Sequence, residues 1–596
     1  QKQIHLLKSI QKMKTNPMNI RLKNSVYLVA ALILIVQVDQ LHAQTSQSRS
    51  QDSIETQVVS IVKPYTPKIS DAFKMKQTPR LGGSETPQKP VTYTIFSIPV
   101  ASTFTPAKGN SVRLKKFKKE KLFQNYAALG LGNYGTVLGN VYLNHTLGRG
   151  ERLGSSIEHY SSQGGIDGLQ LDDDFSNSSV QVNYAKSLKT FVWNSDVTYK
   201  RLAVNWYGLP FETTASIDPR QVYSTVKLGS DIQFTEGVFQ SAKLQLQRFS
   251  DVYDSQEYHL KGESNLQINL LDSPINTVFK VDYLKGEFSK NYTTSQAQPY
   301  GNIQFSLAPS YQYIQDDLTV LVGFKAYYAM DSEQNKNDFY IYPNIEVSYA
   351  VVNSLVVAYA GIKGDLHQNT YQNFAQANPF VSPTLDIRPS HTPYKIVVGT
   401  KGKLSQTVGY DVKGSFTSEQ DKALFRTQSI QNLSIPNNYN RGNSFRVVYD
   451  DVEVFNISGA LEIDMSQKLS MRLKGDLYNY TSDSEPTAWN LPDFEASVFL
   501  DYQLSEKWTF AGSVFYLGSR QDTINFEGLF IPEPITPNTT LDAFIDANVQ
   551  LDYDITNQFS AFVKVNNIVN KSYNRWSNYP VQGLQILGGV SYKFDF

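Results

Sequence analysis

The feature that most constrains this chain is an alternation of apolar and polar residues, repeated from residue 123 to the C-terminus over segments of about 10–16 residues. In residues 541–554, apolar side chains occupy the odd positions and polar ones nearly all the even positions. Successive side chains of a strand point to opposite faces, so each segment has one oily and one polar face. Strands of soluble sandwiches commonly have about 5–6 residues, whereas a tilted strand needs about 9–11 to cross a bilayer. The pattern predicts an all-β fold, a transmembrane antiparallel β-barrel.

The connections between these segments give a strand count. Tight connections alternate with long ones, as short periplasmic turns alternate with long extracellular loops in outer-membrane barrels. Marking strands against this alternation predicts about 22, from near Phe123 to Phe596, and the even number places both barrel ends in the periplasm. An open edge would leave unpaired backbone groups in lipid, so the sheet should close. The tight connections include 235–237, 272–274, 315–317, 466–468, 505–507 and 556–558, and the long ones include 162–176, 207–219, 289–300, 367–391, 421–450, 520–538 and 571–583.

Composition supports a membrane barrel and excludes other classes. Aromatic residues make up 13% of the chain, and 37 Tyr and 33 Phe far outnumber 5 Trp. Tyrosine suits the membrane boundary, since its ring sits against acyl chains and its hydroxyl in the headgroups. Lys plus Arg and Asp plus Glu both number 55, so no basic excess points to nucleic acid as a partner. The absence of cysteine excludes disulfides, thiolate metal sites and Cys nucleophiles.

Residues 1–43 have the pattern of an export signal. Met18 is the better start, and residues 1–17, which lack an initial Met, are left out of fold reasoning. Arg21 and Lys23 form a positive region before an apolar core at 26–36, and Ala43 offers a small residue for cleavage. The core is too short to span a bilayer, which favours a cleaved signal over an uncleaved anchor. We therefore expect export to the outer membrane of a Gram-negative cell.

Residues 44–122 form a polar, Pro-rich lead-in that we assign to the periplasm. The prolines keep the segment extended and deny it a compact core. Residues 115–121, KKFKKEK, lie just before the first expected strand. A solvated charge cluster at the barrel rim is the preferred interpretation of this run, and a docking site for an acidic partner or a lipid headgroup is the alternative.

The C-terminus carries an aromatic alternation that ends on the last residue. Val590, Tyr592, Phe594 and Phe596 alternate with Ser591, Lys593 and Asp595. This looks like the terminal strand that the barrel-assembly machinery recognises during biogenesis. Residues 123–596 are accordingly assigned to one outer-membrane β-barrel.

The last hairpin resembles that of the TonB-dependent receptor family. Residues 565–573 (VNNIVNKSY) and 579–583 (YPVQG) before the terminal strand are similar to the family's closing "N-L-x-N-K-x-Y … P-x-P-G-R" segment, with Ile568 in place of Leu and 581–583 departing from the Pro-Gly-Arg part. Segments such as GLGNYGTVLGNVYLNH look similar to a Bacteroidota-type branch. The resemblance covers roughly 123–596 and implies 22 strands, transport, and TonB as a partner.

One departure from the family concerns the plug. Family members carry a folded plug of well over a hundred residues behind a TonB box, whereas here only about 80 residues separate the expected cleavage site from the first strand. Glu55, Thr56, Val58 and Val59 resemble a TonB box. A 22-stranded barrel without a full plug would be a wide hole. Three alternatives stay open: residues 44–122 fold inward, a separate plug or lipoprotein partner fills the lumen, or loops cap it.

Candidate chemical sites are weak. Residues 172–174 (DDD) could bind Ca²⁺, but no regular ligand spacing follows, so a solvated acidic loop is preferred. Glu158-His159 lacks the spacing of a catalytic metal site. Lumen polarity or a cation-favouring interior would explain a run of acidic residues expected on one strand face. Three bulky aromatic residues are expected at the outer interface or in loops, where anchoring at the interface is the preferred interpretation and stacking on sugars the alternative. The acidic residues are Asp542, Asp546, Asp552 and Asp554, and the aromatic ones are Trp206, Tyr207 and Trp576.

Two functions follow from these patterns. The first is uptake of an unidentified nutrient by a TonB-dependent-receptor-like barrel. The second is a non-transporting structural subunit of an outer-membrane complex for assembly or secretion, motivated by the short lead-in and its KPYTPKISDAF segment. No active-site constellation, metal site or cofactor motif supports an enzyme.

Overall fold

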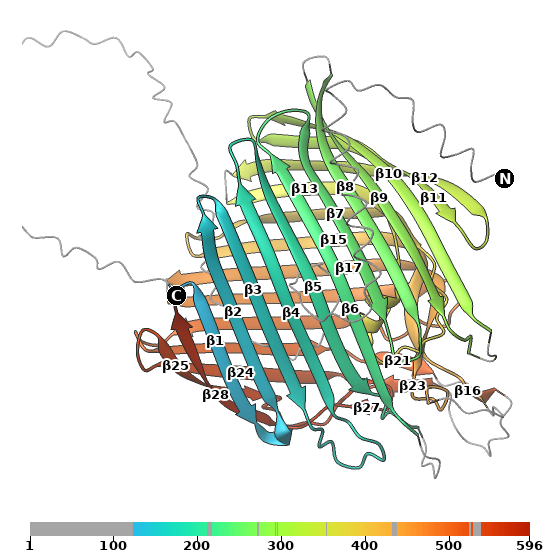
Figure 1. Ribbon diagram of the computed structural model, residues 1–596. Coiled ribbons are helices and arrows are strands. Elements are labelled where there is room, and N and C mark those ends of the chain that lie inside the picture. Colours follow the sequence, from blue (N-terminus) through green and yellow to red (C-terminus); the bar gives the residue numbers. More distant parts are fainter. Residues whose placement is uncertain are drawn as a thin grey trace, which may run out of the picture. The chain divides into compact units, whose positions relative to one another are not determined.

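The structure is a computed structural model that describes residues 123–210, 217–270, 273–292, 294, 296–352, 355–431, 438–466, 468–523, 526–527 and 538–595. Residues 1–43 and 44–122, assigned from sequence to the signal and the lead-in, lie outside this range. So do the TonB-box-like residues and Phe596. The described residues are almost entirely β-strand (Figure 1).

Twenty-two strands form one closed antiparallel sheet, which confirms the predicted fold class and strand count. Each strand pairs with the next along the barrel, and β1 closes the ring on β28, with Asn125 opposite Phe594. Closure satisfies the backbone groups that an edge would expose to lipid. The barrel strands are β1 (Asn125–Gly132), β2 (Val137–Gly148), β3 (Glu151–Ser162), β4 (Phe175–Ser187), β5 (Phe191–Asn205), β6 (Arg220–Phe234), β7 (Phe239–Ser250), β8 (Gln256–Leu270), β9 (Ser273–Phe288), β10 (Gln298–Gln315), β11 (Leu318–Asp331), β12 (Lys336–Val352), β13 (Val356–His367), β14 (Ser390–Lys403), β15 (Val408–Thr427), β17 (Phe445–Ser466), β18 (Leu469–Ser482), β19 (Phe494–Gln503), β20 (Trp508–Leu517), β24 (Phe544–Asp554), β25 (Phe559–Asn566) and β28 (Gln585–Phe594).

Short secondary-structure elements lie at one end of this barrel. Three small two-stranded pairings, a 3₁₀ turn and one helix lie in its connections. No helix among the described residues is long and apolar enough to cross a membrane. The short elements are η2 (Asn133–Gly135), α3 (Tyr371–Ala377), β16 (Ile430–Gln431) paired with β22 (Phe526–Glu527), β21 (Arg520–Thr523) paired with β23 (Asn538–Leu541), and β26 (Asn574–Trp576) paired with β27 (Tyr579–Pro580).

The two faces of each strand differ as the alternation predicts. On β12, Phe339 and Ile341 point outward and are more than 60% exposed. Tyr340 and Tyr342, which alternate with them, face the interior and pack on one another. Exposed apolar side chains at every second position recur on β10, β11, β17 and β28. The outward face thus suits lipid and the inward face carries most of the polar side chains.

The connections fall into two classes, one at each end of the barrel. At the short-turn end, strands join through two to four residues, as at 149–150, 316–317 and 555–558, and the β1–β28 pair places the start of the first barrel strand and the end of the last one there. The long-loop end, marked by the labels β16, β21, β23 and β27 in Figure 1, carries the larger connections. Since outer-membrane barrels have short periplasmic turns and long extracellular loops, the long-loop end is the outer one.

One predicted boundary is wrong. Residues 421–450 were expected to form a long loop, but β15 continues to Thr427 and β17 begins at Phe445. The two strands stay paired beyond a register shift between Glu419 and Lys422. Backbone pairing with the neighbouring strand, which the alternation of side chains does not reveal, extends this hairpin. The connection is therefore residues 428–444.

Candidate functional site

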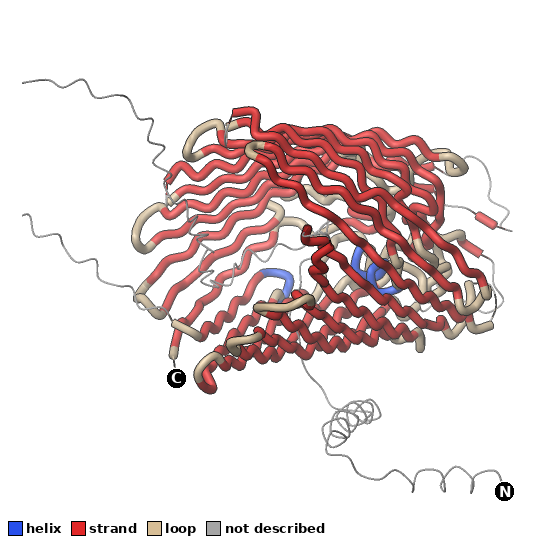
Figure 2. The backbone as a smooth tube through the Cα atoms, turned by 90° about the horizontal axis from the view of Figure 1, so that it is seen from above, coloured by secondary structure: helices blue, strands red, loops and turns tan. Residues whose placement is uncertain are grey.

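The long loops do not stand apart but pack together over the outer end of the barrel. A cluster of buried aromatic residues, which we term the mouth cluster, joins connections from distant parts of the chain. In Figure 2, loops and short helical turns lie between the opposing walls of strands. The mouth cluster comprises Trp206, Tyr207, Tyr253, Phe380, Tyr439, Phe445, Trp576 and Tyr579.

Tyr579 lies at the centre of the mouth cluster. Its ring stacks on Phe380 at 3.6 Å between centroids and contacts Tyr207 at 4.9 Å. Its hydroxyl donates a hydrogen bond of 2.6 Å to the backbone oxygen of Asn443. Burial holds the pKa of Tyr579 well above its ordinary value, so the hydroxyl remains a donor. One side chain thus joins the last long loop to three others.

The aromatic residues expected at the outer interface or in loops, Trp206, Tyr207 and Trp576, belong to this cluster, so they lie in loops and the preferred anchoring at the interface is wrong. Trp206 is fully buried, stacks on Tyr253 and donates its indole N–H to the backbone oxygen of Pro379 at 3.1 Å. Trp576 packs against Phe445. Sequence alone does not distinguish a tryptophan at the lipid boundary from one in a loop core, because both need an apolar surface and a polar partner.

The loop between β13 and β14, residues 368–389, crosses the mouth and is termed the strap. It contains the only α-helix of the described residues, α3, whose first turn is capped by the Thr370 side chain accepting from Asn373 N–H at 3.0 Å. The Tyr371 ring meets Phe249 on β7 and Phe288 on β9 edge to face. Further along, Phe374 packs against Phe425 on β15. The strap thus contacts strands on well-separated parts of the ring.

Two buried carboxylates fasten the start of α3 to the wall. The Glu257 carboxylate, on β8, accepts hydrogen bonds from Tyr371 N–H at 2.6 Å and Gln372 N–H at 3.2 Å. Tyr300 on β10 donates its hydroxyl to the same carboxylate at 2.9 Å. These bonds satisfy backbone donors that the first turn of a helix leaves without intrahelical partners. We term this set of contacts the latch.

Asp251, in the connection between β7 and β8, makes the second of these contacts. Its carboxylate accepts the Tyr371 hydroxyl at 2.7 Å and the N–H groups of Tyr253 and Ser255 at 2.9 Å each. Burial raises the pKa of Asp251 above its ordinary value, against the lowering effect of those donors. The carboxyl therefore sits in a dry place that favours its neutral form.

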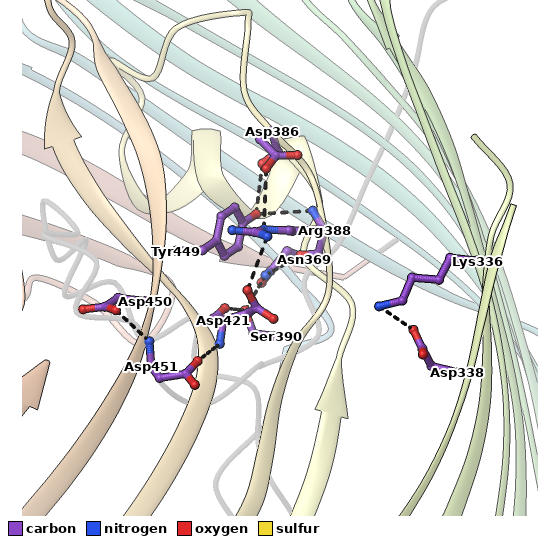
Figure 3. A network of polar contacts seen from close by, with 10 residues as sticks. All are labelled: Lys336, Asp338, Asn369, Asp386, Arg388, Ser390, Asp421, Tyr449, Asp450 and Asp451. Atoms are coloured by element: carbon purple, nitrogen blue, oxygen red, sulfur yellow. Dashed lines mark hydrogen bonds and ion pairs between the residues drawn. The ribbon is translucent and has the colours of Figure 1, made fainter. Parts of the chain in front are cut away.

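A polar network, drawn in Figure 3, holds the base of the strap together. The Asn369 amide donates to the backbone oxygen of Arg388 at 2.8 Å and to the Ser390 hydroxyl at 2.7 Å, which ties the two ends of the loop to each other. The Arg388 guanidinium lies 4.3 Å from the Tyr449 ring centroid. Tyr449 in turn donates its hydroxyl to the backbone oxygen of Asp386 at 2.9 Å. The base of the strap is thus fixed to β17, which is two strands away from β14 in the barrel.

Carboxylates outnumber cations in this network. Arg388 makes ion pairs with Asp386 at 3.5 Å and Asp421 at 3.4 Å, and all three side chains are partly exposed. Burial raises the pKa of Asp386, Arg388 lowers it, and the carboxylate of Asp421 raises it further. The negative charge around the strap base disfavours anions at the mouth.

The sequence candidates for metal binding do not come together. Asp173 accepts Gly165 N–H at 2.9 Å and so closes its own loop, while Asp174 accepts the Asn205 amide at 2.6 Å. Glu158 accepts the Tyr142 hydroxyl at 2.6 Å, and His159 bonds Ser178 and Ser161. Within the part of the chain that the structure describes, no group of three or more His, Asp and Glu side chains could hold a metal ion.

The acidic residues expected on one strand are only partly collinear. Asp546, Asp552 and Asp554 lie on β24, but Asp542 lies in the connection before it. Asp546 accepts the Tyr573 hydroxyl at 2.7 Å, Asp552 accepts the Gln550 amide, and Asp554 accepts the Ser560 hydroxyl at 2.5 Å. These contacts tie neighbouring side chains of the inner wall together and agree with ordinary lumen polarity.

The C-terminal alternation is found on the lipid face. Val590 and Tyr592 on β28 are exposed, and Tyr592 stacks on Phe594 with 5.6 Å between centroids. The described part of the terminal strand thus presents apolar side chains outward, whatever their role in assembly.

Sequence reasoning missed the latch and the strap base. Glu257, Tyr371, Arg388 and Tyr449 gave no motif, because each lies in an ordinary strand or in the long loop. One signal was present: Thr370 before YQNFAQA has the character of a helix N-cap inside a long connection. It would have predicted the helix, but not its partners.

Comparisons with known proteins give the fold and no relative. No protein-family model matches the chain, and no curated protein matches it. Among solved structures, the FrpB iron transporter from Neisseria meningitidis is similar with a TM-score of 0.60 at 10% identity, covering 80% of this chain and 82% of that one. The pyoverdine outer membrane receptor FpvA from Pseudomonas aeruginosa PAO1 gives 0.57 at 13%, covering 80% and 79%. The copper transporter OprC gives 0.55 at 12%, covering 80% and 82%. These neighbours have the 22-stranded fold of TonB-dependent receptors, and this chain shares that fold.

Proposed function

We infer that the protein is an outer-membrane barrel of the TonB-dependent receptor type that takes up a nutrient. The observation that carries this proposal is the closed 22-stranded barrel with an apolar outer face and a polar inner face. A barrel of this size encloses room for a solute larger than those that small porins pass. Its structural neighbours are described as transporters and receptors for iron, siderophores and copper, which supports uptake and leaves the nutrient unidentified.

The N-terminal assignments become part of the proposal. Residues 1–43, starting at Met18, would direct export and be removed, and the barrel-assembly machinery would insert residues 123–596 into outer-membrane lipid. Glu55, Thr56, Val58 and Val59 would then lie in the periplasm, where TonB could pull on them. The Pro-rich composition of residues 44–122 supports an extended reach to such a partner.

Growth of a deletion strain tests the uptake proposal. We expect loss of growth on at least one limiting nutrient, tested among iron chelates, copper and organic nutrients, and recovery when the gene is restored. Deleting residues 55–59 in the restored gene should abolish uptake while the barrel still assembles, since the box acts only through TonB. Unchanged uptake of every nutrient in the deletion strain would show that the transport proposal is wrong.

A structural role is the second candidate. The observation that favours it is the packed mouth, where strap and aromatic loops close the outer end through buried contacts. A barrel that never opens would serve as a scaffold for an assembly or secretion complex. Affinity purification from native membranes discriminates the two: a scaffold should copurify with fixed partners in constant ratio, including a lipoprotein or plug subunit, and a barrel that always elutes alone contradicts it.

A further inference from the structure

The strap is fastened very differently at its base and at its helix. The base is tied by Asn369 to its own other end and by Tyr449 to β17, close to the strands from which it emerges. Helix α3 instead meets strands β7 to β10, reached by crossing the mouth. A loop whose two ends are joined to each other, and whose middle contacts distant strands, is built like a hinged lid.

We propose that the strap is a releasable lid over the barrel mouth and that Glu257 is its latch, holding α3 closed through the backbone N–H groups of Tyr371 and Gln372. This goes beyond the proposed uptake function, since it concerns how the outer end opens whatever solute enters. Release at the latch would leave the base in place (Figure 3), as well as the hydrogen bonds of Pro379 and Ser382, so the part of the strap that would move off the wall is α3.

The carboxylate of Glu257 is held by hydrogen bonds and not by a cationic side chain that the structure describes. Glu257 is only 1% exposed, and no Lys or Arg forms an ion pair with it among the described residues. The nearby His259, on the same face of β8, bonds Asp282 at 2.6 Å instead. The carboxylate is therefore held by N–H and O–H donors, two of which belong to the moving part. A buried carboxylate without those donors would be strongly unfavourable, so closed strap and satisfied carboxylate require each other.

Helix α3 keeps one further hydrogen bond to the wall, from the Tyr371 hydroxyl to Asp251 at 2.7 Å. The strap beyond α3 is held separately, since Pro379 O accepts the Trp206 indole N–H at 3.1 Å and Ser382 N–H donates to Phe445 O at 2.8 Å.

The other strap contacts near α3 are mostly apolar and not directional. Phe374, Ala375, Val381 and Leu385 are buried among side chains of the wall and of other loops. The side chains of Gln247 on β7 and Gln372 also meet. Apolar burial stabilises the closed position, whereas the latch fixes the register of α3 on β8. Loss of the latch should raise the population of an open strap without unfolding the barrel.

Thiol labelling in a protein without natural cysteines tests this. Ala375→Cys places a single small thiol on α3, at a position that is 2% exposed when the strap is closed. A membrane-impermeant maleimide should label it slowly in the purified full-length protein. Adding Glu257→Gln keeps the size of the side chain but turns an amide N–H₂ toward backbone N–H donors. We expect labelling to become about tenfold faster or more, the effect of losing hydrogen bonds to a charged acceptor.

The control lies on the same strand. Glu263 on β8 pairs with Lys280 at 3.1 Å, away from the strap. Ala375→Cys with Glu263→Gln should label at the rate of Ala375→Cys alone. Equal rates in the Glu257→Gln and Glu263→Gln backgrounds, with both barrels folded as judged by heat-modifiable gel mobility, would overturn the proposal.

Two further variants keep the test decisive. If Glu257→Gln does not assemble, Glu257→Asp shortens the side chain and draws the carboxylate away from the N–H groups of Tyr371 and Gln372, and labelling should rise by a smaller factor of about three. No rise there would also overturn the proposal. In a protein carrying Gln247→Cys and Gln372→Cys bridged by a short thiol cross-linker, hydrogen exchange of α3 amides should stay slow even with Glu257→Gln. Fast exchange despite the bridge would show that strap movement is not the cause.

Discussion

Phe380 and Tyr579 stack face to face across the mouth of the barrel, with 3.6 Å between ring centroids and 19° between planes. One residue belongs to the strap after β13 and the other to the last long connection before β28. Their contact joins a loop from the middle of the barrel sequence to one near its end. The outer end is thus held by side chains that only the closed ring of strands brings together.

Tyr579→Ala should loosen the mouth cluster. The change removes the stack on Phe380 and the hydrogen bond to Asn443, and truncating a buried aromatic ring costs about 3–5 kcal/mol. Protease added outside intact cells should then cut the long loops faster, while the barrel stays folded. Tyr349→Ala, on the lipid face of β12, is the control and should leave cutting unchanged. Equal cutting in both variants would show that Tyr579 does not hold the cluster.

Acid should stabilise the barrel mouth through Asp251, because a protonated carboxyl costs less to bury than a carboxylate. Burial raises the pKa of Asp251 in the folded loop above its value in an open chain. The contribution to stability is thus fully present below the unfolded pKa and is lost as pH rises through the raised, folded pKa. Near-ultraviolet circular dichroism of the mouth aromatics should melt at higher temperature in mild acid than at neutral pH. Asp251→Asn, which has no charge to bury, should reduce this dependence, and an unchanged pH dependence in that variant would contradict the assignment.

Gly589→Ala should weaken the seam at which the barrel closes. A Cβ at Gly589 would lie 2.3 Å from the Phe562 ring and 2.5 Å from the backbone oxygen of Leu129 on β1. Overpacking of this kind costs about 1–3 kcal/mol. Gly588→Ala is the matched control, because a Cβ there meets nothing within 4 Å. Heat-modifiable gel mobility should show a lower unfolding temperature for Gly589→Ala only, and equal temperatures would show that the seam relaxes freely.

The C-terminal residues should control assembly. Replacing Tyr592 and Phe594 with Ala takes aromatic side chains from the last strand, and removing Phe596 deletes the terminal residue of the expected signal. If the assembly machinery recognises them together with Val590, the amount of folded barrel in outer membranes should fall severalfold. Ile586→Ala, on the same strand and also exposed, tests whether any loss of outward apolar surface has this effect. Equal loss in the two variants would argue against a terminal signal.

The barrel itself could be predicted because the pattern that specifies each strand lies in consecutive residues. Alternation with a period of two tells each segment which face meets lipid, as Phe339 and Ile341 show against Tyr340 and Tyr342 on β12. Lipid then leaves closure as the only way to satisfy the backbone, so strand number follows from counting turns. The same local pattern failed at residues 421–450, where pairing between β15 and β17 extends into polar sequence.

The mouth was decided only by the tertiary structure. Trp206, Glu257 and Tyr449 lie in or beside ordinary strands, and nothing next to them in sequence identifies Pro379, Tyr371 or Asp386 as their partners. Glu257 and Tyr371, for example, are 114 positions apart in the sequence. Sequence determined the wall, because a strand in lipid needs only its own alternation. The ring of paired strands determined the lid, since a buried carboxylate and a helix start can satisfy each other only once closure has placed them together.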